Sequence, residues 1–310
     1  MSGWTVAVLA LAAALAAPAI ASDYVLHVAV LSFVYLLPAL GLNLVYGYAG
    51  LLSLAEGAFF GIGAYASALL ALRLGWPFWV AFPAAGVICA VLAVPMAVPA
   101  LRLRSYSFVM VTLGFLVITE SVAKNWVGLT RGDMGLIDIP RPRVPGAALA
   151  SVTDFYYLAL VLAVLAALAF RAIVTSAAGR ALIALRDDET LAEAYGLDTW
   201  RFKLAAFVLG ALYAGLGGSL YAHYTTVLDP LVFDVFHTLT LMTIVFGGGA
   251  GTLGGVLLGT VVFLFVPEAL RVAPQWRMVI YGVLLVVFVV RLPGGLGGAL
   301  AGLARWRARA

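Results

Sequence analysis

Long apolar runs recur throughout this 310-residue chain and limit its fold more than any single motif does. They are about 20 residues long, and an α-helix of that length crosses the hydrocarbon core of a bilayer. A soluble helical bundle would need a polar face on each helix, and most of these runs have none. Hydrophobic residue types make up 65% of the chain and charged ones only 10%. The sequence therefore predicts an all-α, polytopic membrane protein.

About ten transmembrane helices are expected, within a single transmembrane domain that covers residues 1–310. The apolar runs that predict them cover residues 4–22, 24–47, 51–72, 77–101, 107–123, 152–171, 203–222, 236–250, 252–267 and 277–292. An even number of spans places both termini on the same side of the membrane.

Basic residues concentrate in the segments 102–104, 171–203 and 291–309. Cytoplasmic loops of membrane proteins carry an excess of Lys and Arg, so all three segments are predicted to be cytoplasmic. With ten spans, both termini of the predicted multi-pass membrane protein are then cytoplasmic. The long, Pro-rich loop 124–150 becomes periplasmic. Because the cations follow this membrane pattern, the net charge of +4 does not indicate a nucleic-acid partner.

The first apolar run has a second interpretation. It ends in "APAIAS", where Ala19 and Ala21 form a small-residue pattern like a signal-peptidase site. The preceding "MSGW" has no Lys or Arg, which favours a retained first helix. Cleavage stays as the alternative and would leave nine spans.

Two glycine-rich stretches differ from the plain apolar runs. They are "GLNLVYGYAGLLSLAEGAFFGIGAY", residues 41–65, and "IVFGGGAGTLGGVLLGT", residues 244–260. Small residues four apart let helix backbones pack closely in lipid. Glycine clusters also permit helix breaks beside a cavity, and such breaks in corresponding halves are typical of transporters built from internal repeats. Both an internal repeat and ordinary tight packing therefore explain the pattern.

We expect translocation-pathway or gating residues in these two stretches. The candidates are the small, polar or acidic positions Asn43, Ser53, Glu56, Gly57, Gly61, Gly247, Gly251 and Gly255. Glu56 is the acidic residue among them. A carboxylate within a span costs about 2.5–3.5 kcal/mol on insertion scales, so it usually faces a cavity or a partner. The alternative for this glutamate is a position near the cytoplasmic end of its span, where water reaches it.

A charged segment, "ALRDDETLAEAYGLDTWRFK", occupies residues 184–203. Between residues 180 and 203, four basic and five acidic side chains nearly cancel, whereas a polybasic lipid-binding segment would be strongly positive. The pattern predicts a helix over 181–194 that ends at Gly196. A short amphipathic helix with both signs of charge suits docking into a groove on a soluble protein, although a solvated loop is the alternative. The candidates for coupling this chain to such a soluble protein are Arg186, Asp187, Asp188, Glu189, Glu193, Ala194 and Gly196.

Several kinds of catalytic or metal site have no support in the residues. Lys124 and Lys203 are the two lysines, and neither follows a glycine, so a phosphate-binding G-x-x-x-x-G-K loop is absent. The single Cys89 excludes a disulfide framework, and no H-E-x-x-H pattern indicates a metal. A membrane enzyme would need a clustered acid–base set. An ion-coupled secondary transporter would need a relay of intramembrane acids or histidines, for which Glu56 is the one loose candidate.

Four stretches of the chain resemble the permeases of the branched-chain amino-acid ABC importer family, LivM-type in particular. They are "GLNLVYGYAGLLSLAEGAFFGIGAY", "ALRDDETLAEAYGLDTWRFKLAAF", "AGLGGSLYAHY" and "RLPGGLGG". Their order and spacing carry the resemblance, which runs from about residue 36 to 297. Glu193, Ala194 and Gly196 are similar to a shortened E-A-x-x-x-G coupling motif. The family usually has Gln, then Gly followed by His or Gln, in the segment of Leu51, Ala55 and Glu56, so the cargo stays open.

This resemblance implies a transmembrane subunit of an ATP-driven importer that works by alternating access. The cargo would be branched-chain amino acids or a related small polar solute such as urea, amides or aromatic acids. The implied partners are a second and different permease subunit, two ABC ATPase subunits, a periplasmic solute-binding protein and membrane lipid. The chain itself would hold no cofactor and would not be an enzyme, because ATP and Mg bind the partner ATPase. Loop 124–150 and the turn 225–230 are expected to receive the solute-binding protein.

Overall fold

The computed structural model describes residues 12–19, 21–103, 105–144, 147–148, 151–269, 282 and 295–298. Residues 4–11 of the first predicted span, and nearly all of the predicted span 277–292, lie outside the described residues. Where the chain is described it is dominated by helices, which confirms the predicted all-helical, polytopic membrane fold.

Among the residues that the structure describes, six helical segments are long and apolar enough to cross a membrane. They are α2 (Asp23–Leu42) with its continuation η2 (Asn43–Tyr48), α3 (Glu56–Leu74), α4 (Phe78–Ala100), α5 (Ser105–Asn125), α7 (Val152–Thr175) and α10 (Thr199–Thr225). Two shorter apolar helices follow, α11 (Val235–Gly248) and α12 (Leu253–Ala269). All eight coincide with predicted spans, whereas the total of ten stays a prediction.

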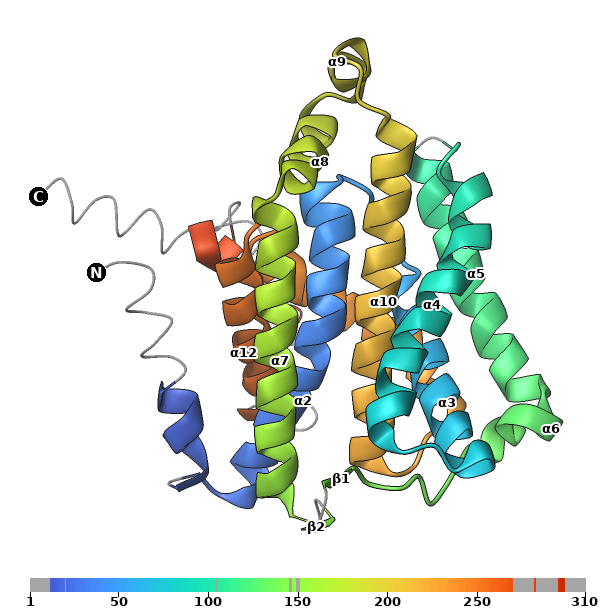
Figure 1. The fold of residues 1–310 in the computed structure, drawn as a ribbon, viewed down its shortest axis with the longest axis vertical. Coiled ribbons are helices and arrows are strands. Elements are labelled where there is room, and N and C mark those ends of the chain that lie inside the picture. The colour runs from blue at the N-terminus through green and yellow to red at the C-terminus, as the bar shows by residue number, and fades with distance from the viewer. Residues whose placement is uncertain are drawn as a thin grey trace, which may run out of the picture.

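The connections between these helices lie at two opposite ends of the bundle (Figure 1). At one end lie α8 (Ala177–Asp187), α9 (Glu189–Ala194) and the connection between α4 and α5. At the other end lie α6 (Val127–Thr130), η3 (Gly132–Met134) and a hairpin of two-residue strands, β1 (Arg143–Val144) and β2 (Ala147–Ala148). We call these the α9 end and the β-hairpin end. For the segments 102–104, 171–203 and 124–150, this grouping is the one that the charge distribution predicts, whereas nearly all of the basic segment 291–309 lies outside the described residues.

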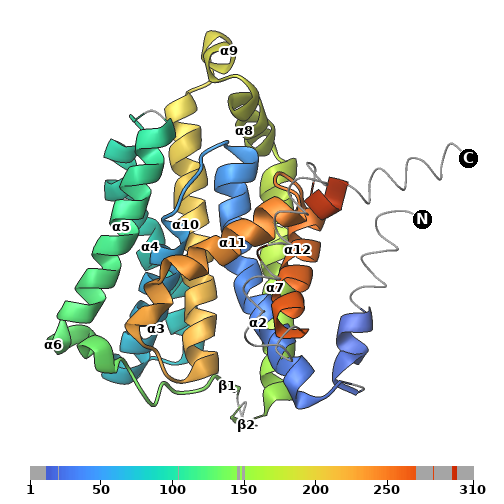
Figure 2. The ribbon, with the colours of Figure 1, turned by 180° about the vertical axis from the view of Figure 1, so that it is seen from behind.

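Helix α10 lies at the centre of the bundle and packs along α2, α3 and α4 (Figures 1 and 2). Its glycines allow this close approach: a Cβ on Gly41 of α2 would lie 2.6 Å from the carbonyl oxygen of Gly210. A Cβ on Gly63 of α3 would overlap the backbone of Gly215. In lipid, where water exclusion does not drive helices together, such backbone contact provides van der Waals packing.

The outer surfaces of α4, α5 and α7 are apolar and exposed. Large side chains that stand more than half exposed there include Val87, Val91, Met110, Ile118, Val161, Leu165 and Leu168. Monomeric soluble proteins rarely expose apolar patches of this extent. These faces are therefore suited to contact lipid.

Helices α11 and α12 form a pair that is separated by a glycine break. Figure 2 shows α11 crossing obliquely in front of α10 and α2, with α12 beside it. The short helix η4 (Pro230–Phe233) precedes α11, and η1 (Ala17–Ala19) precedes α2. A Cβ on Gly255 would lie 2.6 Å from the carbonyl oxygen of Gly248, so the backbones of the two helices touch.

Candidate functional site

The charged segment forms two helices, so the prediction of one continuous helix over 181–194 was wrong. The chain turns extended at Asp188, with φ −156° and ψ 106°. The Asp188 side chain accepts a hydrogen bond from the N–H of Leu191 at 2.9 Å. This cap stabilises the start of α9, and α8 ends at Asp187, one residue before the cap. Gly196, at φ +83°, follows α9, and its N–H donates to the carbonyl of Glu193 at 2.8 Å. The predicted helix end at Gly196 is confirmed.

Helix α9 is attached to the first turns of α10. The Thr199 hydroxyl donates to Glu193 at 2.7 Å, and Lys203 forms an ion pair with Glu189. These bonds orient α9 so that it protrudes from the α9 end of the bundle (Figure 1). On the protruding surface, Leu191 is 54% exposed and Tyr195 is 83% exposed. Our list of coupling candidates omitted both residues, although apolar side chains inside a charged segment were the available signal.

Arg186 points in the opposite direction, towards the membrane helices. Its Nη1 donates a hydrogen bond to the carbonyl oxygen of Gly47 in η2 at 2.6 Å. The same guanidinium pairs with Asp187 at 3.2 Å. The Arg186 stem packs on Gly50, where a Cβ would lie 2.9 Å from Arg186 Cγ. Of the predicted coupling residues, Asp188, Glu189 and Glu193 bond within 188–203, and Arg186 reaches the glycine-rich stretch 41–65.

The two glycine-rich stretches meet at this same place. The N–H of Gly251 donates to the side-chain oxygen of Asn43 at 2.8 Å, and Asn43 is fully buried. A Cβ on Gly47 would overlap both Asn43 Oδ1 and the backbone nitrogen of Gly251. Glycine is therefore required at position 47 for the two stretches to touch. Helix breaks are present in both stretches, at residues 49–55 and 249–252.

The break at 49–55 contains Ser53 and ends just before Glu56. Helix α3 begins at Glu56, whereas the predicted span began at residue 51. The N–H groups just before Glu56 bond to side chains: Ala55 donates to Ser53 Oγ, and Leu54 donates to Thr112 Oγ1 of α5, both at 3.1 Å. Glu56 is 1% exposed. The alternative for Glu56, a position at the cytoplasmic end of the span where water reaches it, is therefore wrong.

The surroundings of Glu56 are apolar. Val45, Phe59 and Cys89 belong to the buried cluster around it, and a Cβ on Gly210 would lie 3.1 Å from Glu56 Oε1. Within the described parts of the chain, its Oε2 atom has no hydrogen-bond partner. An unpaired buried carboxyl oxygen is costly, and this cost is the reason to regard Glu56 as a functional candidate.

The other glycine candidates lie where helices pack tightly. A Cβ at each would overlap a neighbour: Gly57 meets Thr238 of α11, Gly61 meets Phe233 of η4, Gly247 meets Phe263 of α12, and Gly255 meets Thr252. The structure thus places these glycines at contacts of α3 and α12 with α11 and η4. Their role in a translocation route stays a prediction.

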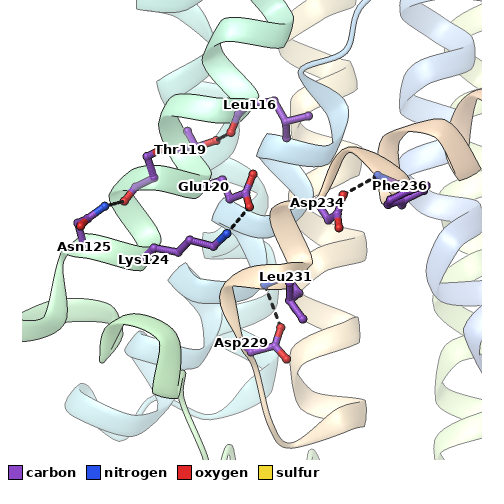
Figure 3. Close-up of polar contacts among 10 residues, drawn as sticks. Leu116, Thr119, Glu120, Lys124, Asn125, Asp229, Leu231, Asp234 and Phe236 are labelled. Carbon is purple, nitrogen blue, oxygen red and sulfur yellow. Dashed lines mark hydrogen bonds and ion pairs between the residues drawn. The ribbon is translucent and has the colours of Figure 1, made fainter.

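Polar residues at the β-hairpin end mostly fix local structure. Lys124 donates a hydrogen bond to Glu120, four residues earlier on α5, at 2.6 Å (Figure 3). Asp229 caps η4 and Asp234 caps α11, each through a side-chain oxygen 3.0 Å from a backbone nitrogen. Across the described residues, no group of three or more His, Cys, Asp or Glu side chains could hold a metal ion.

The two connections predicted to receive a soluble partner lie together at the β-hairpin end. Leu136, in the loop 124–150, and Leu228, in the turn 225–230, exchange backbone hydrogen bonds of 2.7 and 2.8 Å. His223 links the same two regions, because its Nδ1 lies 2.7 Å from the carbonyl oxygen of Pro140. The two connections are therefore bonded to each other at this end of the bundle.

Comparisons with known proteins agree with this architecture. Residues 24–289 match a family model described as the permease component of branched-chain amino acid transport systems. The chain is 32% identical over 306 residues to the high-affinity branched-chain amino acid transport system permease protein LivM of Escherichia coli K12, covering 91% of this chain and 72% of that protein. It is 26% identical to the permease protein LivH of Salmonella typhimurium, covering 85% of this chain and 91% of LivH. No solved structure matches. The chain therefore belongs to the permease components of branched-chain amino acid transport systems, the membrane-embedded permease subunits of ABC importers.

Proposed function

We propose that this chain translocates branched-chain amino acids, or a related small polar solute such as urea, amides or aromatic acids, across the cell inner membrane by alternating access. The names of its relatives support an amino-acid cargo. One structural observation carries the mechanism: the α8–α9 segment protrudes from the bundle, and its Arg186 bonds to Gly47 in η2, beside a break between membrane helices. A force applied to this segment from outside the membrane would reach the interior of the bundle.

ATP hydrolysis belongs to separate polypeptides in this proposal. The chain has no Gly-Lys phosphate-binding loop, so two ABC ATPase subunits would bind ATP and Mg and supply the work. A second permease subunit would complete the membrane domain. Both LivM and LivH are relatives of this chain, and they are two different permease proteins, which favours a partner different from this chain.

The α9 end faces the cytoplasm in this arrangement, and both termini lie there too. The basic segments 102–104 and 171–203 support this orientation through the positive-inside rule. The β-hairpin end then faces the periplasm, where the loop 124–150 and the turn 225–230, joined by the backbone bonds of Leu136 and Leu228, would receive a solute-binding protein.

The exposed surface of α9 has the chemistry of a docking helix. Leu191 and Tyr195 supply apolar anchors that the bundle leaves uncovered. Charged residues around them, such as Asp187 and Glu189, provide a polar rim. A buried apolar centre within a polar rim is the usual anatomy of a protein interface.

Site-specific crosslinking in membranes that contain the assembled importer tests this assignment. A photoreactive residue at Tyr195 should form adducts with the ATPase subunit. The matched control at Met134, which is 88% exposed in η3 beside α6, should not. Adducts to the ATPase from Met134 alone would reverse the orientation. Uptake that continues with a hydrolysis-dead ATPase would instead favour an ion-coupled secondary transporter.

A further inference from the structure

The last six residues of the first described span form a wide helix. Residues Asn43–Tyr48 of η2 are π-helical, and the turn that follows continues with bonds from Ala49 N–H to the Leu44 carbonyl at 3.1 Å and from Leu51 N–H to the Val45 carbonyl at 3.0 Å. π-Helical residues are well below 1% of residues in proteins and occur frequently at functional sites. This segment therefore needs a physical explanation.

Contacts from two distant segments hold the wide helix in place. The first contact comes from Gly251, which donates its N–H to Asn43. The second comes from Arg186, which donates to the carbonyl of Gly47, and a charged donor makes this hydrogen bond stronger than one between neutral groups. A Cβ on Gly251 would lie only 3.0 Å from Arg186 Nη1, so the guanidinium lies where the two glycine breaks meet.

The same guanidinium is also connected to the break between α8 and α9. Its Nε and Nη2 atoms lie 3.3 and 3.2 Å from Oδ1 of Asp187, the last residue of α8. Asp188, next in the chain, has the extended backbone that separates α8 from α9. Asp187 therefore lies next to the junction with α9, and a displacement of α9 that pulls on this junction would shift one of the two acceptors that position Arg186.

We propose that Arg186 is a positioning residue that transmits displacement of α9 to η2, and through Asn43 to the break before α12. The inference rests on the proposed function, because it presumes that a partner moves α9. Arginine suits this position since its planar guanidinium bonds two acceptors at once, which the single ammonium of lysine does less well. Helix α10 offers a parallel route through the Glu189–Lys203 and Glu193–Thr199 contacts, so the test must separate the two.

The first experiment compares Arg186→Gln with the matched control Arg180→Gln in the assembled importer. Arg180 is exposed on the same helix and donates to the carbonyl of Thr175, away from η2. Three quantities are measured: ATPase subunit that co-purifies, ATP hydrolysis and solute uptake. We expect Arg186→Gln to retain the ATPase and to hydrolyse ATP, while uptake per ATP falls about tenfold or more, a loss of ~1.4 kcal/mol of coupling. Arg180→Gln should match the wild type.

Two results would overturn the inference. Unchanged uptake per ATP in Arg186→Gln would show that α10 alone carries the displacement. Loss of the ATPase from that variant would place Arg186 in the docking surface. A wild-type importer that never co-purifies with an ATPase would instead sink the proposed function, so the two failures are distinguishable.

A second experiment replaces the polar contact with a covalent one. A Cβ on Gly50, two residues after η2, would lie 3.5 Å from Arg186 Cβ, at the lower end of the ~3.5–4.5 Å range of disulfides. Because Gly50 has φ +72°, a cysteine there is strained, so the single variant Gly50→Cys is measured as the control. The variant Arg186→Cys should be uncoupled. The double variant Gly50→Cys with Arg186→Cys should regain coupling when oxidised and lose it on reduction, with the buried Cys89 retained throughout. An oxidised double variant no better coupled than its reduced form would contradict the proposed transmission.

Discussion

Asn43 accepts a hydrogen bond from the backbone N–H of Gly251 at 2.8 Å, across a sequence separation of 208 residues. This bond joins the two glycine-rich stretches at the point where Arg186 also contacts Gly47. Both stretches interrupt a helix there, and their glycines make room for each other's backbone. The junction explains why glycine is needed at position 47 and where the charged α8–α9 segment meets the membrane helices.

Replacing Gly47 with alanine should destabilise the junction. The new Cβ would overlap Asn43 Oδ1 and the Gly251 nitrogen, so the two glycine-rich stretches must move apart. Overpacking of this kind costs about 1–3 kcal/mol, which thermal unfolding in detergent would register as a lower midpoint. Gly114→Ala in α5 is the control, because nothing lies within 4 Å of its added Cβ. Equal stability of the two variants would contradict the contact at Gly47.

Removing the cap of α9 should weaken docking of the ATPase. Asp188→Ala loses the hydrogen bond to the Leu191 N–H, a change that costs about 1 kcal/mol at helix N-termini. A frayed α9 presents Leu191 and Tyr195 less rigidly, so less ATPase should co-purify with the permease. Asp188→Asn keeps a capping side chain and should retain the ATPase. If alanine and asparagine behave alike, the cap does not matter for assembly.

Glu56→Gln should change the uptake rate without blocking assembly. The amide has nearly the shape of the carboxyl group, so the buried packing around Val45, Phe59 and Cys89 is preserved. What changes is the chemistry of the Oε2 position, which has no partner among the residues that the structure describes. We expect at least about a twofold change in uptake, measured beside co-purification of the ATPase. Wild-type uptake would end the hypothesis that Glu56 lies on the translocation route.

Ser67→Ala should destabilise the contact between α3 and α10. The Ser67 hydroxyl lies 2.9 Å from Nε2 of His223 and 2.7 Å from the hydroxyl of Ser219, all in buried positions. Its removal deprives His223 of a partner, and an unsatisfied buried polar group costs about 1–3 kcal/mol. Unfolding of Ser67→Ala is compared with that of Ser107→Ala, an exposed serine on α5. A destabilisation no larger than that of Ser107→Ala would refute the importance of this network.

The sequence by itself predicted the membrane helices, because a helix that crosses lipid needs about 20 apolar residues and its backbone bonds are local. It also predicted the charged segment between the helices now seen as α7 and α10, since charges are excluded from the bilayer core. The bounds of α4 and α7 differ from the predicted spans by only a few residues. Local signals placed the helix end at Gly196, but they did not reveal the division at Asp188, where a side chain ends one helix and caps the next.

Only the tertiary structure decided which candidates come together. The partners in Arg186–Gly47 and Asn43–Gly251 are 139 and 208 residues apart, and no local pattern links them. Glycine spacing identified close packing in general, yet the neighbour of each glycine depends on how α3, α10, α11 and α12 cross. Burial of Glu56 follows from the break at 49–55, which starts α3 inside the bundle. Hydropathy and charge act along the chain, whereas these contacts arise from the packing of helices in three dimensions.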